Sequence, residues 1–324
     1  MKIDFKKLGL ASVIVSLMVL PLFAAGLIKI DGSSTVFPIT EGVAEEFQQA
    51  FPGNKVTVGI SGTGGGFKKF CRGEIDIADA SRPIQTAEID VCKDNAVQFI
   101  ELPVAFDGLA VVVNPKNTWV DSITPAELKK IWEPAAQGKI MKWNDIRPNW
   151  PDKAIKLFGP GTDSGTFDYF TEIINKKAKA SRGDYTASED DNVLVQGVAT
   201  DPYALGYFGM AYLEHNKERI KAVPVNGILP TYDNVLSTKY QPLARPIFIY
   251  VNVKSLDKPE IQKFVEFYLK NGAAITKEVG YVALPAKAYE LALAKLNAKR
   301  IGTVFAGKSK PGVTVEEILT KEKI

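Results

Sequence analysis

The fold is decided by residues Leu27 to Pro38, which read Leu-Ile-Lys-Ile-Asp-Gly-Ser-Ser-Thr-Val-Phe-Pro. The first four residues form a short β-type run, and the Gly, Ser and Thr after them suit a turn and a helix N-terminus. From Ile39 to Phe51 an apolar residue recurs every four positions, which indicates an amphipathic helix. The stretch therefore predicts a strand, a turn and a helix in succession, a unit of α/β folds.

The same unit returns further along the chain. The predicted strands are residues 55–60, 75–78 and 154–158, and the turns after them read Ser61-Gly-Thr-Gly-Gly-Gly66, Asp79-Ala-Ser-Arg-Pro83 and Gly159-Pro-Gly-Thr-Asp-Ser-Gly-Thr166. Phe67 and Phe70 mark the helix after the second turn, and Phe167, Phe170 and Ile174 mark the helix after the last one. No repeat of 20 to 50 residues is present, which excludes a solenoid.

The chain has 324 residues, more than one hydrophobic core usually supports, so two domains are expected. Two strongly apolar runs, 109–114 and 246–253, are interpreted as crossings between two lobes. Lobe one then comprises residues 27–108 and 250–324, and lobe two comprises 109–249. Two extended crossings would form a hinge, because they can absorb a rotation while each core stays packed.

The composition is that of a globular protein, with 46% hydrophobic and 24% charged residues. The formal net charge is +3, and removing the first 25 residues takes away three lysines and one aspartate and leaves +1. Such a balance gives no reason to expect nucleic acid or an anionic membrane as a partner. Any attraction for an anionic ligand must therefore be local.

Residues 1–25 are predicted to be a cleaved signal peptide. Lys2, Lys6 and Lys7 form a basic start, residues 8–23 are largely apolar, and the small residues 24–26 offer a processing site. The alternative is an uncleaved membrane anchor, but this run is shorter than the roughly 20 residues that span a bilayer. The protein is therefore expected to be exported.

Two cysteines, Cys71 and Cys92, enclose twenty residues. In an oxidising compartment they could pair and stabilise the fold by about 3 kcal/mol, and the alternative is a pair of buried free thiols. Two cysteines and a single histidine, His215, cannot build a zinc site of the usual kind. No metal and no cofactor are expected.

Three of the predicted turns share Ser, Thr and Gly directly before a helix. A helix N-terminus presents unpaired N–H groups and a partial positive charge, Gly allows an anion to approach the backbone, and hydroxyls add donors. Taken singly, each turn is explained as well by ordinary helix capping. Together they predict an anion site, because ligands of open α/β sheets lie beyond the carboxyl ends of the strands.

The combination of motifs resembles the PstS-type periplasmic phosphate-binding proteins over essentially the whole mature chain. The motifs are Gly32-Ser-Ser-Thr-Val-Phe-Pro38, Ser61-Gly-Thr-Gly-Gly-Gly66, Ala80-Ser-Arg-Pro83, Asn114-Pro115, Ile123-Thr-Pro125, Lys142-Trp-Asn-Asp145, Ser164-Gly-Thr166, Ala204-Leu-Gly-Tyr-Phe-Gly209 and Arg245-Pro-Ile-Phe-Ile-Tyr250. The resemblance implies a two-lobed α/β clamshell that binds inorganic phosphate between its lobes. It also implies a monomeric, non-enzymatic periplasmic receptor that delivers phosphate to a membrane ABC importer with permease and ATPase subunits.

Position by position, the resemblance implies a set of phosphate-binding residues. They are Ser34, Thr35, Val36, Thr63, Ser164, Gly165 and Thr166, to which the site hypothesis adds Ser81 and Arg82. Many relatives have an acceptor Asp in place of Ser81 and an Arg in place of Pro160. We therefore expect Arg82 to supply the cation, the alternative being a surface salt bridge. Asp79, Asp107 and Asp163 are the candidates for an acidic group that accepts a proton from the ligand.

Two other functions are weighed against phosphate binding. The first is the binding of another oxyanion or small acid on the same fold, which the departures at residues 81 and 160 keep open. The second is a secreted phosphate-ester hydrolase, which the lack of a His-rich metal site disfavours; a serine hydrolase is disfavoured by the absence of a G-x-S-x-G motif. The string Gly302 to Ser309 matches a P-loop, but Pro311 and Gly312 stop any helix after it, so we interpret the match as chance.

Overall fold

The computed structural model describes residues 26–237 and 239–305. The predicted signal peptide and the second half of the P-loop-like string lie outside the described residues. Within the described ranges, no helix combines the length and the apolar composition that crossing a bilayer requires.

The strands form one twisted sheet in two halves. Their bounds are β1 Leu27–Gly32, β2 Lys55–Ile60, β3 Ile77–Ala80, β4 Phe99–Val113, β5 Lys156–Pro160, β6 Thr186–Ser188, β7 Ala204–Gly209, β8 Lys221–Ala222, β9 Ala244–Asn252 and β10 Val282–Ala283. The order across the sheet is β2-β1-β3-β9-β4-β7-β5-β6, and β10 and β8 both pair with β4. The pairs β1–β2, β1–β3, β5–β6 and β5–β7 are parallel, as expected for strands linked through helices.

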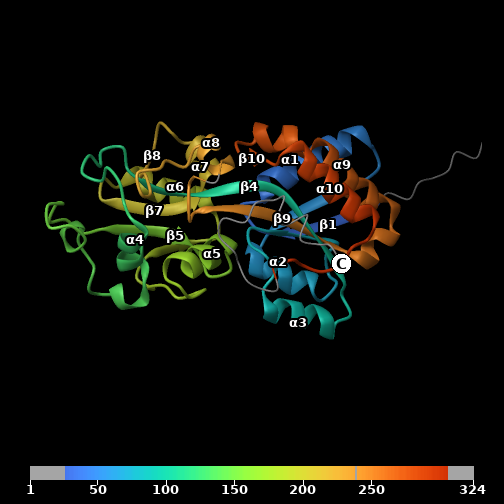
Figure 1. The fold of residues 1–324 in the computed structure, drawn as a ribbon, viewed down its shortest axis with the longest axis horizontal. Helices are drawn as coiled ribbons and strands as arrows, with labels where there is room; N and C mark the ends of the chain where they lie inside the picture. Colours follow the sequence, from blue (N-terminus) through green and yellow to red (C-terminus); the bar gives the residue numbers. More distant parts are fainter. Residues whose placement is uncertain (1–25, 238, 306–324) are drawn as a thin grey trace, which may run out of the picture.

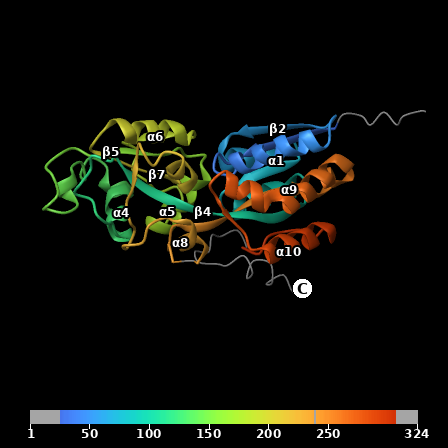
Figure 2. The same cartoon turned by 90° about the horizontal axis from the view of Figure 1, so that it is seen from above.

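Helices cover both faces of each half. Their bounds are α1 Phe37–Ala50, α2 Gly62–Phe70, α3 Thr86–Asp94, α4 Pro125–Trp132, α5 Gly165–Ile174, α6 Asp191–Thr200, α7 Met210–Glu214, α8 Tyr232–Leu236, α9 Pro259–Glu278 and α10 Ala286–Asn297, with short 3-10 helices at Pro134–Ala136, Trp143–Asp145 and Val253–Asp257. In the half that contains β1, α1, α9 and α10 cover one face and α2 and α3 the other (Figures 1 and 2). In the second half, α6 and α7 lie opposite α4 and α5.

The two long strands β4 and β9 connect the halves (Figure 1). Residues 99–108 of β4 pair with β9, and residues 109–113 pair with β7 of the second half. The run 109–114, interpreted from sequence as a crossing, falls on this second part of β4. The run 246–253 falls largely on β9, whose residues pair with β3 and the first part of β4. The two-lobed α/β fold is thus observed, while the residue-by-residue division into lobes stays a prediction.

Most of the predicted elements are present, and the main difference, at the start of α2, comes from packing against residues distant in sequence. The strand and helix around Leu27–Pro38 and the strand 55–60 are confirmed, whereas β3 begins two residues later than predicted. The Gly-rich turn 61–66 is mostly the first turn of α2 rather than a loop before it. A Cβ atom on Gly66 would lie 2.7 Å from the Cα of Gly32, so the glycines allow α2 to pack directly on the end of β1.

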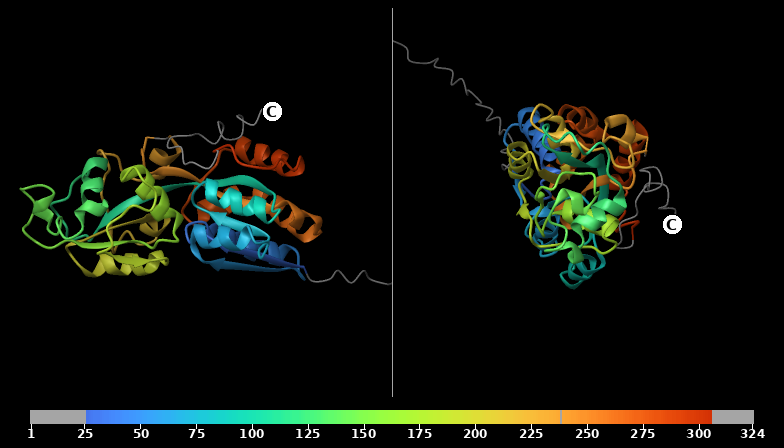
Figure 3. Two further views of the ribbon diagram at one scale, coloured as in Figure 1. Left: turned by 90° about the horizontal axis from the view of Figure 1, so that it is seen from below. Right: turned by 90° about the vertical axis from the view of Figure 1, so that its left-hand side faces the viewer.

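The ends of α2 and α5 meet where the two halves join. The N–H of Gly64 in α2 donates to the carbonyl oxygen of Asp163, just before α5, over 3.2 Å. Gly62 has a φ of +73°, and a Cβ there would lie 2.2 Å from the same carbonyl oxygen, so only Gly fits this approach. Figure 3 shows the two halves side by side from below, with this junction between them. In the first half, Cys71 and Cys92 form a disulfide that ties the end of α2 to α3.

Candidate functional site

Polar turns from both halves converge at this junction. The first half contributes the turn between β1 and α1, the start of α2 and the loop after β3, and the second half contributes the N-terminus of α5. Their hydroxyl-bearing residues are all buried: Ser33, Ser34, Thr35, Thr63, Ser81, Ser164 and Thr166. Buried hydroxyls require hydrogen-bond partners, so such a group at a lobe boundary suits a polar ligand.

The hydroxyls touch one another across the junction. Thr35 Oγ1 lies 3.1 Å from Thr166 Oγ1, a contact between the two halves. Thr63 Oγ1 lies 3.2 Å from Ser81 Oγ and also accepts the Ser81 N–H over 3.1 Å. A Cβ on Gly165 would lie 2.3 Å from Thr63 Oγ1 and 2.4 Å from Ser81 Oγ. The structure therefore brings four of the predicted residues into one hydroxyl cluster around Gly165: Thr35, Thr63, Ser81 and Thr166.

Several of the predicted backbone donors are already used within their own turns. The Thr35 N–H donates to Ser33 Oγ, and the Thr166 N–H donates to Ser164 Oγ, both over 3.1 Å. The Val36 N–H donates to the Ser33 carbonyl oxygen over 3.2 Å. Ser164 thus plays the ordinary capping role that the sequence also allowed. An ion at the junction would share these amides and would rely more on the hydroxyls and on a cation.

Arg82 is not arranged as predicted from the sequence. Its Nε donates to Asp168 Oδ2 over 2.7 Å, and its two Nη atoms donate to both carboxylate oxygens of Glu88 over 2.8 Å. Nη1 also donates to the Pro83 carbonyl oxygen over 3.1 Å. Arg82 is only 1% exposed, so its salt bridges are buried rather than on the surface, where the alternative placed them. Within the described part of the chain, the hydrogen bonds of this guanidinium therefore go to two carboxylates and one carbonyl oxygen, and none goes to the hydroxyls.

The cation that contacts the hydroxyl cluster is Arg245, at the start of β9. Its Nη2 donates to Thr166 Oγ1 over 2.7 Å, and its Nη1 donates to the Gly165 carbonyl oxygen over 3.0 Å. Its Nε and Nη2 also lie 3.3 Å and 3.1 Å from Asp107 Oδ2, on the neighbouring strand β4. Arg245 belongs to one of the quoted motifs, but the site hypothesis omitted it. The available signal was an arginine heading an otherwise apolar strand.

Of the three acids considered as proton acceptors, Asp107 lies beside the hydroxyl cluster, because Arg245 bonds to both Asp107 and Thr166. It is fully buried, and burial raises its pKa while Arg245 lowers it. Asp79 points into the first half, where its Oδ1 accepts from Thr40 over 3.0 Å, and burial raises its pKa well above the usual range. Asp163 is half exposed and pairs with Lys68 at 3.4 Å.

A further buried acid lies near Arg245. Asp191, at the start of α6, is fully buried, and its pKa is raised to about 8. Burial is the main cause, Asp107 raises the pKa further, and Arg245 lowers it. At neutral pH this carboxyl is therefore largely protonated and adds little negative charge beside Arg245.

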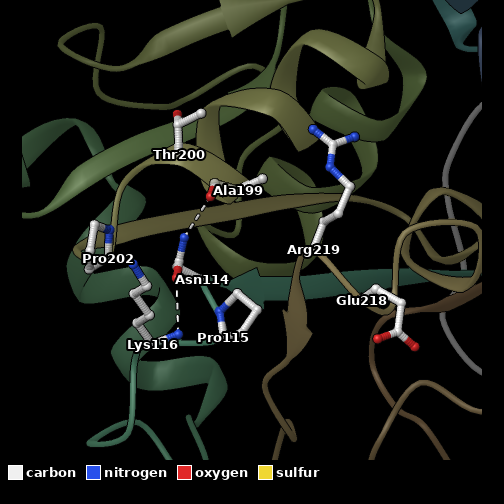
Figure 4. Close-up of a pocket in the computed structure, with 8 residues that line it drawn as sticks. All are labelled: Asn114, Pro115, Lys116, Ala199, Thr200, Pro202, Glu218 and Arg219. Carbon is white, nitrogen blue, oxygen red and sulfur yellow. Dashed lines mark hydrogen bonds between the residues drawn. The ribbon is translucent and has the colours of Figure 1, made fainter.

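The other polar features lie elsewhere. A surface pocket of about 390 Å³ in the second half is lined by Asn114, Lys116 and Arg219, among others (Figure 4). The side-chain amide of Asn114 donates to the carbonyl oxygens of Val198 and Ala199 and is therefore already satisfied. In the described ranges, no group of three or more His, Cys, Asp or Glu side chains could hold a metal ion.

Comparison with known proteins assigns the family. The model of the PBP superfamily domain matches residues 23–271. Protein SphX of Synechocystis sp. is 52% identical over 300 residues, which cover 91% of this chain and 89% of SphX. The phosphate-binding protein PstS of Staphylococcus saprophyticus is 39% identical, with 84% and 85% covered. A crystal structure described as a possible phosphate binding protein from Planctomyces limnophilus is 48% identical, with a TM-score of 0.65, and covers 85% of this chain and 99% of its own.

These matches extend over both halves and include the residues of the hydroxyl cluster between them. The chain therefore belongs to the PBP superfamily and, within it, to the PstS-type phosphate-binding proteins.

Proposed function

We propose that this protein is an exported receptor that captures inorganic phosphate between its two lobes and delivers it to an ABC importer with permease and ATPase subunits. It carries out no chemistry on the ion and acts as a periplasmic monomer. The observation that carries the proposal is the convergence of buried hydroxyls from both halves around Gly165 and Arg245. The name of the PstS relative, a phosphate-binding protein, agrees with it.

The arrangement suits a small tetrahedral anion. A buried oxyanion is costly unless its lone pairs are satisfied, and a charge-assisted hydrogen bond contributes roughly 1.5 to 3 kcal/mol. Micromolar binding requires about −8 kcal/mol, which the hydroxyls and one guanidinium can supply. The proposed phosphate-binding residues are Ser34, Thr35, Val36, Thr63, Ser81, Ser164, Gly165 and Thr166, with Arg245 in place of Arg82 as the cation.

The lobes themselves are part of the proposal. We propose the division predicted from the sequence, with residues 27–108 and 250–324 in lobe one and residues 109–249 in lobe two, and with β4 and β9 as the connections. Phosphate favours the closed arrangement because it bonds to groups of both lobes only when they are in contact.

A second candidate ligand is another oxyanion. Ser81, at the position where many relatives have an acceptor carboxylate, offers a hydroxyl that faces Thr63 at 3.2 Å. A hydroxyl both donates and accepts, so it discriminates less strictly than a carboxylate between protonated and fully ionised anions.

Titration calorimetry of the mature protein with phosphate, sulfate and arsenate at two pH values tests the proposal. We expect micromolar or tighter binding of phosphate and arsenate. Sulfate bound more tightly than phosphate would favour the second candidate, and no heat with phosphate would reject the proposal. A chromogenic phosphate-ester assay with added divalent metals tests for hydrolysis, and we expect no turnover.

A further inference from the structure

One buried ion pair joins the two halves beside the proposed phosphate-binding residues. Arg82 directly follows Ser81 at the end of β3, and Asp168 lies in the first turn of α5, two residues after Thr166. Arg82 Nε and Asp168 Oδ2 are 2.7 Å apart, and each side chain is 1% exposed. The pair therefore ties together the two backbone segments that present Ser81 and Thr166.

Each partner also has a counter-ion within its own half. Glu88 on α3 binds the Arg82 guanidinium with both carboxylate oxygens, and Glu88 is itself fixed because it accepts the Gln85 N–H over 2.8 Å. Lys179 Nζ lies 3.9 Å from Asp168 Oδ1 in the second half. If the halves separate, Arg82 keeps Glu88 and Asp168 keeps Lys179.

This double pairing lowers the free-energy cost of separating the two halves. A buried charge that loses its only partner is strongly destabilising. Here neither charge is left alone, and opening also exposes both groups to water. The contact between Arg82 and Asp168 contributes only while the halves touch, so it biases the equilibrium between the two arrangements without locking it.

We propose that Arg82 and Asp168 form a latch that stabilises the closed arrangement and so sets how tightly the ligand is held. Both act as positioning residues that align the loop after β3 with the start of α5, and neither contacts the ligand. The effect on affinity rests on the proposed function, whereas the effect on closure does not.

A matched control is available in a second ion pair across the same junction. Lys68 Nζ and Asp163 Oδ1 are 3.4 Å apart, and their side chains are 67% and 47% exposed. Exposed pairs of this kind contribute little to stability because water screens them. Lys68→Ala therefore removes an inter-lobe charge contact without removing a latch.

The test compares Asp168→Asn with Lys68→Ala in the mature protein. X-ray scattering without ligand measures opening, and calorimetry measures phosphate affinity. For Asp168→Asn we expect a larger ligand-free radius of gyration, the wild-type radius at saturating phosphate, and about tenfold weaker affinity, a typical coupling between sites. Lys68→Ala should match the wild type in all three measurements. Arg82→Lys keeps the charge beside Glu88 and should fall between the wild type and Asp168→Asn.

The outcomes separate the latch from the proposed function. A ligand-free radius for Asp168→Asn and Arg82→Lys equal to that of the wild type overturns the latch, and so does an equal increase for Lys68→Ala. If the wild type does not bind phosphate, the proposed function fails, yet the ligand-free radii still decide whether Arg82 and Asp168 hold the halves together.

Discussion

Two buried arginines lie at the same junction, and they differ in how many carboxylates surround them. Arg82 faces two, Glu88 and Asp168, whereas Arg245 faces one, Asp107, and directs its remaining N–H groups to Thr166 and Gly165. Each guanidinium is 1% exposed. Burial alone therefore does not mark an anion-binding arginine. Arg245 differs in two ways: a single carboxylate, that of Asp107, balances its positive charge, and it contacts the hydroxyl cluster.

The comparison is tested most strongly by replacing each arginine with glutamine. Arg245→Gln removes charge-assisted hydrogen bonds worth roughly 1.5 to 3 kcal/mol each, so we expect phosphate affinity to fall about 100-fold. Arg82→Gln should cost about tenfold, through closure only. Calorimetry measures both, and thermal unfolding shows that each variant is folded. A larger loss for Arg82→Gln would reverse the assignment of the two arginines.

The surroundings of Arg245 can be disturbed without touching its charge. Gly165→Ala would place a Cβ within 2.4 Å of the Thr63 and Ser81 hydroxyls, so either the hydroxyls or α5 must move. Overpacking typically costs 1 to 3 kcal/mol, and we expect about tenfold weaker phosphate binding. Gly272→Ala is the control, because its Cβ would have only ordinary contacts, the nearest at 3.5 Å from Tyr268. Unchanged binding by Gly165→Ala would contradict the central place of Gly165.

The smallest expected effect concerns the charge of Asp191. Because its folded-state pKa is about 8 and an unfolded Asp titrates near 3.9, the folded state holds a proton that the unfolded state has lost between these values. Stability from this group therefore falls as pH rises through that window, by about 1 kcal/mol between pH 7 and 8. Denaturant unfolding of the wild type should show this loss.

Asp191→Asn is the control for this titration. It should remove the pH-dependent loss, because the amide does not ionise. If the wild type and Asp191→Asn have the same pH dependence, Asp191 is ionised at neutral pH. Arg245 would then lie near two negative charges, and its difference from Arg82 would disappear.

Local features of the molecule were predictable from the sequence. The strand, turn and helix from Leu27 to Ala50 follow from neighbouring residues alone, since the apolar spacing, the turn-forming residues and the proline in the first helical turn lie within one segment. The Gly-rich start of α2 was not predictable in this way. Glycine is a poor helix former, and this turn is helical because it packs on Gly32 and Asp163, which are distant in sequence.

The roles of the two arginines depend entirely on distant partners. Arg82 and Asp168 are 86 residues apart, and Arg245 and Gly165 are 80 residues apart. A single sequence shows that both are arginines near turns or strand ends, but it does not show how many carboxylates face each one. The sequence therefore predicts the hydroxyl-bearing turns, but it gives no reason to prefer Arg245 over Arg82 as the cation.

Asp107 and Arg245 sit opposite each other on β4 and β9, at the end of their paired register and just before β4 continues into the second half. Points close to an axis of rotation travel least when two bodies turn about it. If the halves turn about these two strands, the cation keeps its place while the hydroxyls on either side swing towards it. An incoming anion would then meet the same positive charge in an open molecule as in a shut one.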